Sequence, residues 1–157
     1  MANFMQEGLP VWDICCDHGL LGEYALRTKR FPEVHFVDQV PNILQKTQRR
    51  LLRFSEARFH CVDATALAEP LNGNVVIAGV GGKKIIQILH SSQRRNLLRA
   101  TRMILSPHKD RPLIAMLAQD PNWQNWELSE SCQMEDKGQE HHIFVFTAKA
   151  ATEFQLR

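Results

Sequence analysis

The sequence lacks several features that would assign a chain quickly to a class of protein. No apolar run is long enough to cross a bilayer, so we expect neither a membrane-spanning segment nor a membrane partner. Residues 1–10 have no basic start and no apolar core, so a secretory signal is not expected. We also find no internal repeat and no low-complexity tract. These absences favour a globular protein without a targeting segment.

Motifs for metals and disulfides are missing too. The four cysteines form no Cys-x-x-Cys pair, and no set of cysteines and histidines has the spacing of a zinc site. His141 and His142 are adjacent but have no evident third ligand, which favours a surface pair over a metal site. Cys15 and Cys61 end apolar runs, and this favours buried, reduced thiols in a cytoplasmic protein.

The length of 157 residues suits one domain, expected at residues 1–150 with a tail at residues 151–157. The formal net charge of +2 neither requires nor excludes a nucleic-acid partner, because a basic patch can occur within a balanced total. Two groups of arginines fall on expected helices, namely Arg49, Arg50 and Arg53, and Arg94, Arg95 and Arg99. Solvated helix faces are the default interpretation, and phosphate contacts are the alternative.

Strand-like and helix-like segments alternate along the chain. Strands are expected at residues 11–15, 34–37, 58–62, 74–78, 102–105, 126–131 and 142–147. Helices are expected at residues 20–28, 41–52, 83–89 and 112–117. Turns are expected at Asn72-Gly73 and Lys137-Gly138. The pattern predicts an α/β, Rossmann-like fold with a mostly parallel twisted sheet, helices on both faces and an antiparallel edge hairpin.

Residues suited to ligand binding follow each of the first four expected strands. They are residues 13–19, Asp38 with Gln39, Asp63 with Ala64, and residues 79–82. Ligands of such folds bind at the carboxyl ends of the parallel strands, so these residues should form one site. A carboxylate after the second strand can accept hydrogen bonds from both hydroxyls of a ribose, and a polar residue after the third can bond an adenine amino group. The arrangement predicts a nucleoside cofactor.

The first of these loops argues against a dinucleotide. The G-x-G-x-x-G fingerprint is absent, and alternate positions of the loop hold Asp13, Cys15, Asp17 and Gly19. A carboxylate at Asp17 would repel a pyrophosphate, whereas it tolerates a sulfonium cation. The loop therefore favours S-adenosylmethionine over NAD.

Three motifs then follow one another along most of the chain. The first is Asp13-Ile14-x-x-Asp17-His18-Gly19, similar to D-I-G-S/T-D-H-A/G. The second is Ile77-Ala78-Gly79-Val80-Gly81-Gly82, similar to I-A-G-M-G-G, with a helix containing Ile85, Ile86, Ile88 and Leu89. The third comprises Leu105-x-Pro107 and, further on, Leu113, Leu117, Trp126, Leu128, Glu130, Glu135 and Gly138. Together they resemble the TrmK-type bacterial tRNA adenine-N1 methyltransferases, with Cys15 where that family has glycine.

The resemblance implies a class I methyltransferase fold, S-adenosylmethionine as cofactor and tRNA as the RNA partner. Position and resemblance together assign cofactor contacts to Asp13, Cys15, Asp17, His18, Gly19, Asp38, Gln39, Asp63, Ala64, Ala78 and Gly79. Substrate contacts are assigned to Gly81, Gly82, His108 and Lys109. Asp17 is the expected catalytic residue, because a carboxylate can stabilise the methylated, positive ring or accept a proton from its exocyclic amine.

Other interpretations stay open at this point. Asp13 and Asp17 could cap the turn and the helix that follow them, and the glycines could serve close packing only. The chain could be a degenerate module that binds the cofactor or RNA with little catalysis. It could also be a small-molecule methyltransferase built on the same domain.

Overall fold

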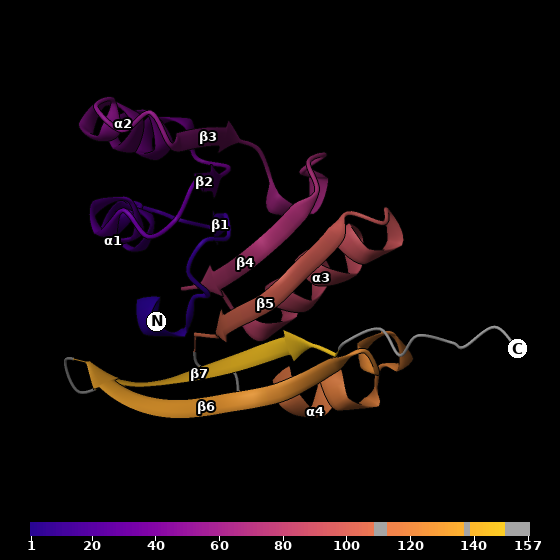
Figure 1. The fold of residues 1–157 in the computed structure, drawn as a ribbon. Coiled ribbons are helices and arrows are strands. Elements are labelled where there is room, and N and C mark those ends of the chain that lie inside the picture. Colours follow the sequence, from indigo (N-terminus) through magenta and orange to yellow (C-terminus); the bar gives the residue numbers. More distant parts are fainter. Residues whose placement is uncertain (109–112, 137–138, 150–157) are drawn as a thin grey trace, which may run out of the picture.

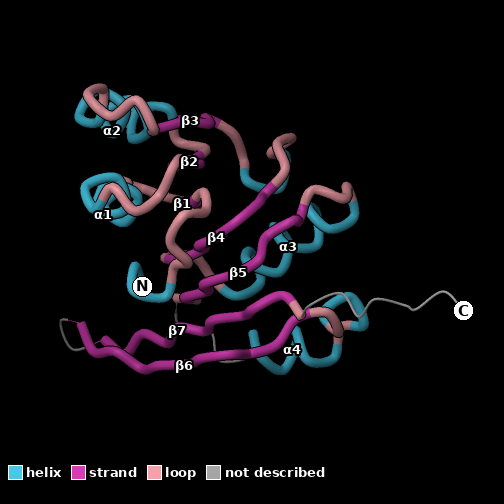
Figure 2. Tube along the Cα trace, in the orientation of Figure 1, coloured by secondary structure: helices cyan, strands magenta, loops and turns pink. Residues whose placement is uncertain are grey.

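The computed structural model describes residues 1–108, 113–136 and 139–149, which form one seven-stranded sheet flanked by helices (Figures 1 and 2). The strands are β1 (Val11–Ile14), β2 (Val34–Asp38), β3 (Ala57–Cys61), β4 (Leu71–Ala78), β5 (Leu98–Ser106), β6 (Trp126–Asp136) and β7 (Gln139–Ala148). Their order in the sheet is β3-β2-β1-β4-β5-β7-β6. Pairs from β3 to β5 are parallel, and β7 is antiparallel to both β5 and β6. The expected sheet with its antiparallel edge hairpin is confirmed.

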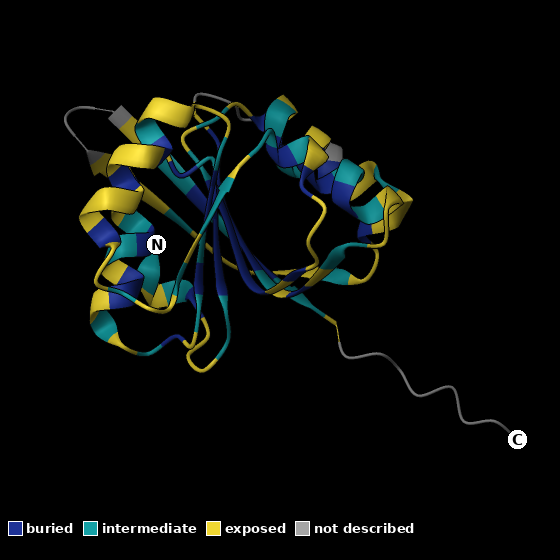
Figure 3. Cartoon of the chain, turned by 90° about the horizontal axis from the view of Figure 1, so that it is seen from above, coloured by how far each residue is buried: buried dark blue, intermediate teal, exposed yellow. Residues whose placement is uncertain are grey.

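Helices cover both faces of this sheet (Figures 1 and 3). α1 (Leu20–Thr28) and α2 (Pro41–Leu51) lie together on one side, and α3 (Gly82–Arg94) and α4 (Leu113–Gln119) lie on the other. Pro41 begins α2, because its fixed φ and missing N–H suit the first turn of a helix. Short 3-10 helices are η1 (Ala2–Phe4), η2 (Ala64–Ala66) and η3 (Pro121–Trp123). Within the described residues, every helix is too short or too polar to cross a membrane.

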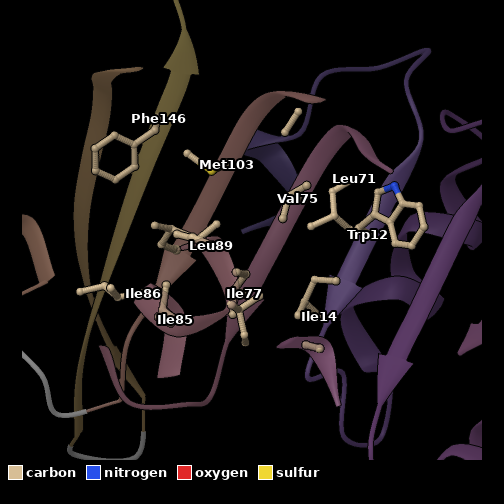
Figure 4. Close-up of a cluster of buried hydrophobic side chains, with 14 of the residues drawn as sticks. Trp12, Ile14, Leu71, Val75, Ile77, Ile85, Ile86, Leu89, Met103 and Phe146 are labelled. Carbon is tan, nitrogen blue, oxygen red and sulfur yellow. The ribbon is translucent and has the colours of Figure 1, made fainter. Parts of the chain in front are cut away.

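Each face of the sheet has its own apolar core. Under α3, the fully buried Val75 and Ile77 of β4 pack with Ile85 and Leu89 (Figure 4). Under α1, the ring of Phe36 fills the space that side chains at Gly19 and Gly22 would otherwise occupy. A Cβ on Gly22 would lie 2.3 Å from Phe36 Cε1, so only glycine lets α1 approach β2 this closely. This contact fixes the position of the loop that precedes α1.

The expected turn at Asn72-Gly73 is wrong, since both residues lie inside β4. The strand begins earlier, at Leu71, because that side chain is buried in the core and its backbone pairs with β5. Gly73 has a φ of +69°, and the pairing with β5 shifts register between Gly73 and Asn74. The glycine therefore serves a bulge in a strand and not the end of one.

Two further expectations are wrong. Arg99 lies in β5 and not on a helix, because β5 begins at Leu98. Cys61 is exposed, since it ends β3 at the edge of the sheet, where no further strand covers it. The expected Lys137-Gly138 turn and the tail at residues 151–157 lie outside the described residues.

Candidate active site

Two adjoining clefts open where strands β1 to β5 end. The larger has a volume of about 610 Å³ and lies over the ends of β2, β3 and β4. The smaller has a volume of about 320 Å³ and lies over the ends of β1, β4 and β5. Cys15, Asp17 and Gly79 line both clefts and so form their junction. A third groove, of about 630 Å³, runs along α3 and contains none of the predicted site residues, so we assign the site to the two clefts.

The loop between β1 and α1 has an alternating backbone. Cys15, Asp17 and Gly19 have φ values of 59°, 48° and 64°, all in the left-handed region. Glycine adopts this region freely and aspartate tolerates it, but a cysteine there is strained by about 1–2 kcal/mol. Three of the alternate loop positions noticed in the sequence, residues 15, 17 and 19, are therefore those at which the backbone adopts the left-handed conformation.

Main-chain hydrogen bonds tie this loop to the end of β2. The N–H of Asp17 donates to Asp38 Oδ2, and the N–H of Val40 donates to Asp38 Oδ1, each at 2.9 Å. The N–H of Cys16 donates to the carbonyl oxygen of Val37 at 3.1 Å. Each oxygen of Asp38, which lines the larger cleft, thus keeps a further lone pair that can accept a hydrogen bond. A carboxylate held in this way is oriented before any ligand arrives.

Asp13 lies beneath the loop, 5% exposed, and lines the smaller cleft. Its Oδ2 accepts a hydrogen bond of 3.0 Å from the N–H of Gly22 in the first turn of α1. Asp13 thus accepts a hydrogen bond from the first turn of α1 as well as lining the cleft, whereas the N-cap of α1 is Gly19 and not Asp17. Burial raises the pKa of this carboxyl to about 7, against the Gly22 hydrogen bond and with help from the nearby charge of Asp38.

Asp63 follows β3 and lines the larger cleft beside the buried Ala64. Its Oδ1 accepts hydrogen bonds of 2.8 Å from both the N–H and the hydroxyl of Thr65. Lys84 of α3 reaches across the cleft and donates to both carboxylate oxygens at 3.1 Å. The Thr65 hydrogen bonds, followed by that of Lys84, lower the pKa of Asp63 to about 2. The carboxylate is therefore charged at any ordinary pH, ready to accept a hydrogen bond from an amino group.

The smaller cleft brings together residues from both predicted sets. His18 and Ala78, predicted as cofactor contacts, line it together with His108, a predicted substrate contact, whose N–H donates to the carbonyl oxygen of Val80 at 2.8 Å. His141 of β7 closes the far side, with its ring centroid 6.1 Å from that of His108. The other predicted substrate contact after β5, Lys109, lies outside the described residues.

Gly79 and Gly81, which follow β4, border open space and do not pack against other residues, whereas Gly82 is buried in α3. A Cβ on Gly79 or on Gly81 would meet no atom within 4 Å, and Gly79 has a φ of +71°. Gly79 lines both clefts, whereas Gly81 lines the larger one, as Gln39 also does. Among the described residues predicted for the site, Gly19 and Gly82 line neither cleft. Gly19 instead packs against Thr47 and Phe36.

Besides several apolar wall residues, three polar side chains that line the clefts were missed in the sequence. In the sequence, Lys84 cannot be told from any other lysine on a helix, and only the folded structure shows that it contacts Asp63. Ser106 ends β5 and lines the smaller cleft, and its position at the end of the fifth strand was the available signal. His141 comes from the returning strand of the hairpin, so only the antiparallel pairing with β5 brings it to the site.

The thiol of Cys15 lies at the junction of the clefts in its uncharged form. Burial, followed by the charge of Asp38, raises its pKa to about 11. Because the thiolate is the nucleophilic form, this environment keeps Cys15 from reacting with an electrophile held in the clefts.

We expect Cys15→Gly to stabilise the chain by about 1 kcal/mol, because glycine has no strain at a φ of 59°. For a domain of this size that raises the Tm by about 2–4 °C, measurable by calorimetry. Cys15→Ala keeps the strained Cβ while removing the sulfur and should not raise the Tm. An equal gain in both variants would mean that the sulfur, and not the backbone, is the source of strain.

The raised pKa of Asp13 predicts a pH dependence of stability. Folding favours the protonated form of this carboxyl. Its contribution to the free energy of unfolding is therefore fully present below about pH 4 and is lost as the pH rises through about 7. Asp13→Asn keeps an acceptor for the Gly22 N–H but cannot ionise. Urea unfolding should therefore give a free energy of unfolding for the wild type that falls relative to that of this variant between pH 5 and pH 8. A constant difference between the two proteins would contradict the prediction.

Comparison with known proteins gives the family context. A family model described as "Methyltransferase domain" matches residues 1–144. A Mycoplasma genitalium protein assigned as a tRNA methyltransferase, MG248, is 28% identical in an alignment of 142 positions that covers 87% of this chain. The chain spans 62% of the length of that relative.

Solved structures share the fold. Sp1610 of Streptococcus pneumoniae, described as a tRNA (m1A22) methyltransferase, has a TM-score of 0.81 at 20% identity, over 94% of this chain and 67% of its own. The M. capricolum TrmK, solved with S-adenosyl-homocysteine, has a TM-score of 0.78 at 15% identity, over 98% of this chain and 69% of its own. These likenesses confirm the class I methyltransferase fold that the sequence motifs implied.

Proposed function

Because the chain belongs to the methyltransferase-domain family, we propose that it transfers the methyl group of S-adenosylmethionine to RNA, with N1 of an adenine in tRNA as the target. The observation that carries this proposal is the position of Asp17 at the junction of the two clefts. The larger cleft suits a nucleoside cofactor and the smaller cleft suits a base. The carboxylate of Asp17 lies where the two clefts meet. With tRNA as substrate, we also propose a cytoplasmic location.

The residues of the larger cleft fit the proposed cofactor. Asp38 is anchored by one N–H on each oxygen, which leaves acceptors for two ribose hydroxyls. Asp63 can accept from an adenine amino group, and Val40, Ile43 and Val62 supply apolar walls for a flat ring. The open space beside Gly81 suits close approach by the ligand. When bound, S-adenosylmethionine supplies an electrophilic methyl group on a positively charged sulfur.

In the proposed reaction, the protein positions the reacting atoms and stabilises the charge that develops on the adenine ring. N1 of adenine attacks with its own lone pair, so no base has to activate it. The attacking nitrogen must lie in line with the carbon–sulfur bond, so the cleft walls supply much of the rate by orientation. The new N–C bond leaves the ring positive. The carboxylate of Asp17 stabilises that charge or accepts a proton from the exocyclic amine.

Two measurements test the proposal. Calorimetry with S-adenosylmethionine should show binding, and its absence would sink the enzymatic function in favour of a module without catalysis. Transfer of labelled methyl groups to tRNA, followed by nucleoside analysis, should yield 1-methyladenosine. Cofactor binding with no methylation of tRNA would favour a small-molecule acceptor instead.

A further inference from the structure

The outer side of α1 continues the wall of the smaller cleft. Leu20 and Tyr24 lie one turn apart on this helix, with 70% and 50% of their surface exposed. Leu20 also lines the smaller cleft. One exposed leucine is ordinary, but residues four apart on a helix are neighbours. Together they extend the cleft as an apolar and aromatic ridge.

The neighbouring helix α2 adds positive charge beside this ridge. Lys46 and Arg49 are exposed on α2, and Arg53 follows just after its end, at the spacing of one helix face. α2 contains no acidic residue. In the described part of the chain, neither Lys46 nor Arg49 forms an ion pair. Although the net charge of the chain is only +2, the positive charges of Lys46 and Arg49 lie unpaired on this face of α2.

Contacts join this basic face to the loop of the active site. The guanidinium of Arg50 donates to the carbonyl oxygen of His18 at 2.6 Å and to Glu23 of α1 at 2.9 Å. Thr47 packs directly against Gly19, since a Cβ there would lie 2.6 Å from Thr47 Cγ2. Arg50 and Thr47 thus hold α2, with its exposed cations, against α1 and against the loop that bears Asp17. The exposed outer sides of the two helices are visible at the left of Figure 3.

We propose that this α1–α2 surface, made of Leu20, Tyr24, Lys46, Arg49 and Arg53, binds the RNA strand that adjoins the target adenosine. The proposal rests on the proposed function. Tyr24 stacks on an unpaired base next to the adenine in the cleft, because an exposed aromatic ring is a platform for any base. The three cations contact phosphates of the same strand, in the combination of rings and positive charge typical of single-stranded nucleic-acid sites.

Binding of a fluorescently labelled tRNA transcript, measured by anisotropy without cofactor, tests the surface. Tyr24→Ala should weaken binding about 10-fold, whereas Tyr24→Phe should bind like the wild type because the ring is kept. The double variant Lys46→Ala and Arg49→Ala should weaken binding and lower the slope of log K against log salt by about 1–2.

Matched controls lie elsewhere on the molecule. Met134→Ala removes a side chain that is also 50% exposed, from β6, and Arg94→Ala removes a cation from the groove along α3. Both should leave tRNA binding unchanged. The proposal is overturned if Tyr24→Ala binds like the wild type, if Tyr24→Phe loses as much as Tyr24→Ala, or if Arg94→Ala loses as much as the α2 variant.

The outcome is separable from the proposed function because the assay needs neither cofactor nor turnover. Wild-type protein that binds tRNA through this surface but does not methylate it would sink the proposed function alone. Protein that methylates tRNA while Tyr24→Ala leaves binding unchanged would sink the α1–α2 surface alone.

Discussion

Replacing Asp38 with alanine is expected to weaken S-adenosylmethionine binding by about 10²–10⁴-fold. Two hydrogen bonds from a ribose to a charged carboxylate contribute about 1.5–3 kcal/mol each, and both are lost. The same substitution leaves the N–H groups of Asp17 and Val40 without their present acceptor, so only the hydrogen bond from Cys16 to Val37 still joins the loop to β2. Isothermal calorimetry measures the loss directly.

The variant Asp38→Asn distinguishes the effect of the carboxylate charge on cofactor affinity from the effect of the shape of the side chain. The amide keeps the shape of the side chain and one carbonyl acceptor, so one main-chain tie can persist while the second oxygen becomes a donor. We expect an affinity between those of the wild type and Asp38→Ala. Thermal unfolding without cofactor checks that both variants are folded. Unchanged affinity in the alanine variant would place the ribose elsewhere and contradict the assignment of the larger cleft.

Replacing Asp17 with asparagine is expected to lower kcat for tRNA methylation by about 10²–10⁴-fold, the usual range for a group that manages a proton or a charge in the transition state. Affinity for the cofactor should fall much less than kcat, because the carboxylate beside the sulfonium is lost while the main-chain N–H that donates to Asp38 remains. Single-turnover methylation at saturating cofactor measures the chemical step.

The asparagine variant is the informative one at this position. Asp17 has a φ of 48°, a region that asparagine tolerates as aspartate does, so the loop can keep its conformation. Asp17→Ala would add backbone strain to the loss of charge. Arg94→Ala is the control, since Arg94 lies in the groove along α3 and lines neither cleft of the site. If Asp17→Asn methylated tRNA at the wild-type rate, the catalytic role would be wrong.

Much of the architecture could be predicted from the sequence because it depends on local patterns. Apolar runs ending in acids marked the parallel strands, and the missing helix between the last two strands marked the hairpin. Asp38 and Asp63 were recognised because strand ends meet at one edge of a parallel sheet. The errors occurred where an element continued past a turn-like pair, as at Asn72-Gly73, because burial of Leu71 outweighs the local preference for a turn.

The sequence by itself determined the order of the elements, the acids at the strand ends and the alternate positions of the first loop. Tertiary structure alone decided that Cys15 is strained, that Asp13 is buried with a raised pKa, and that Lys84 neutralises Asp63. It also brought His141 from the edge hairpin to the smaller cleft and set Arg50 of α2 against the loop between β1 and α1. The reason is physical: a pattern of residues specifies local conformation, whereas burial, charge pairing and backbone strain depend on neighbours that only folding supplies.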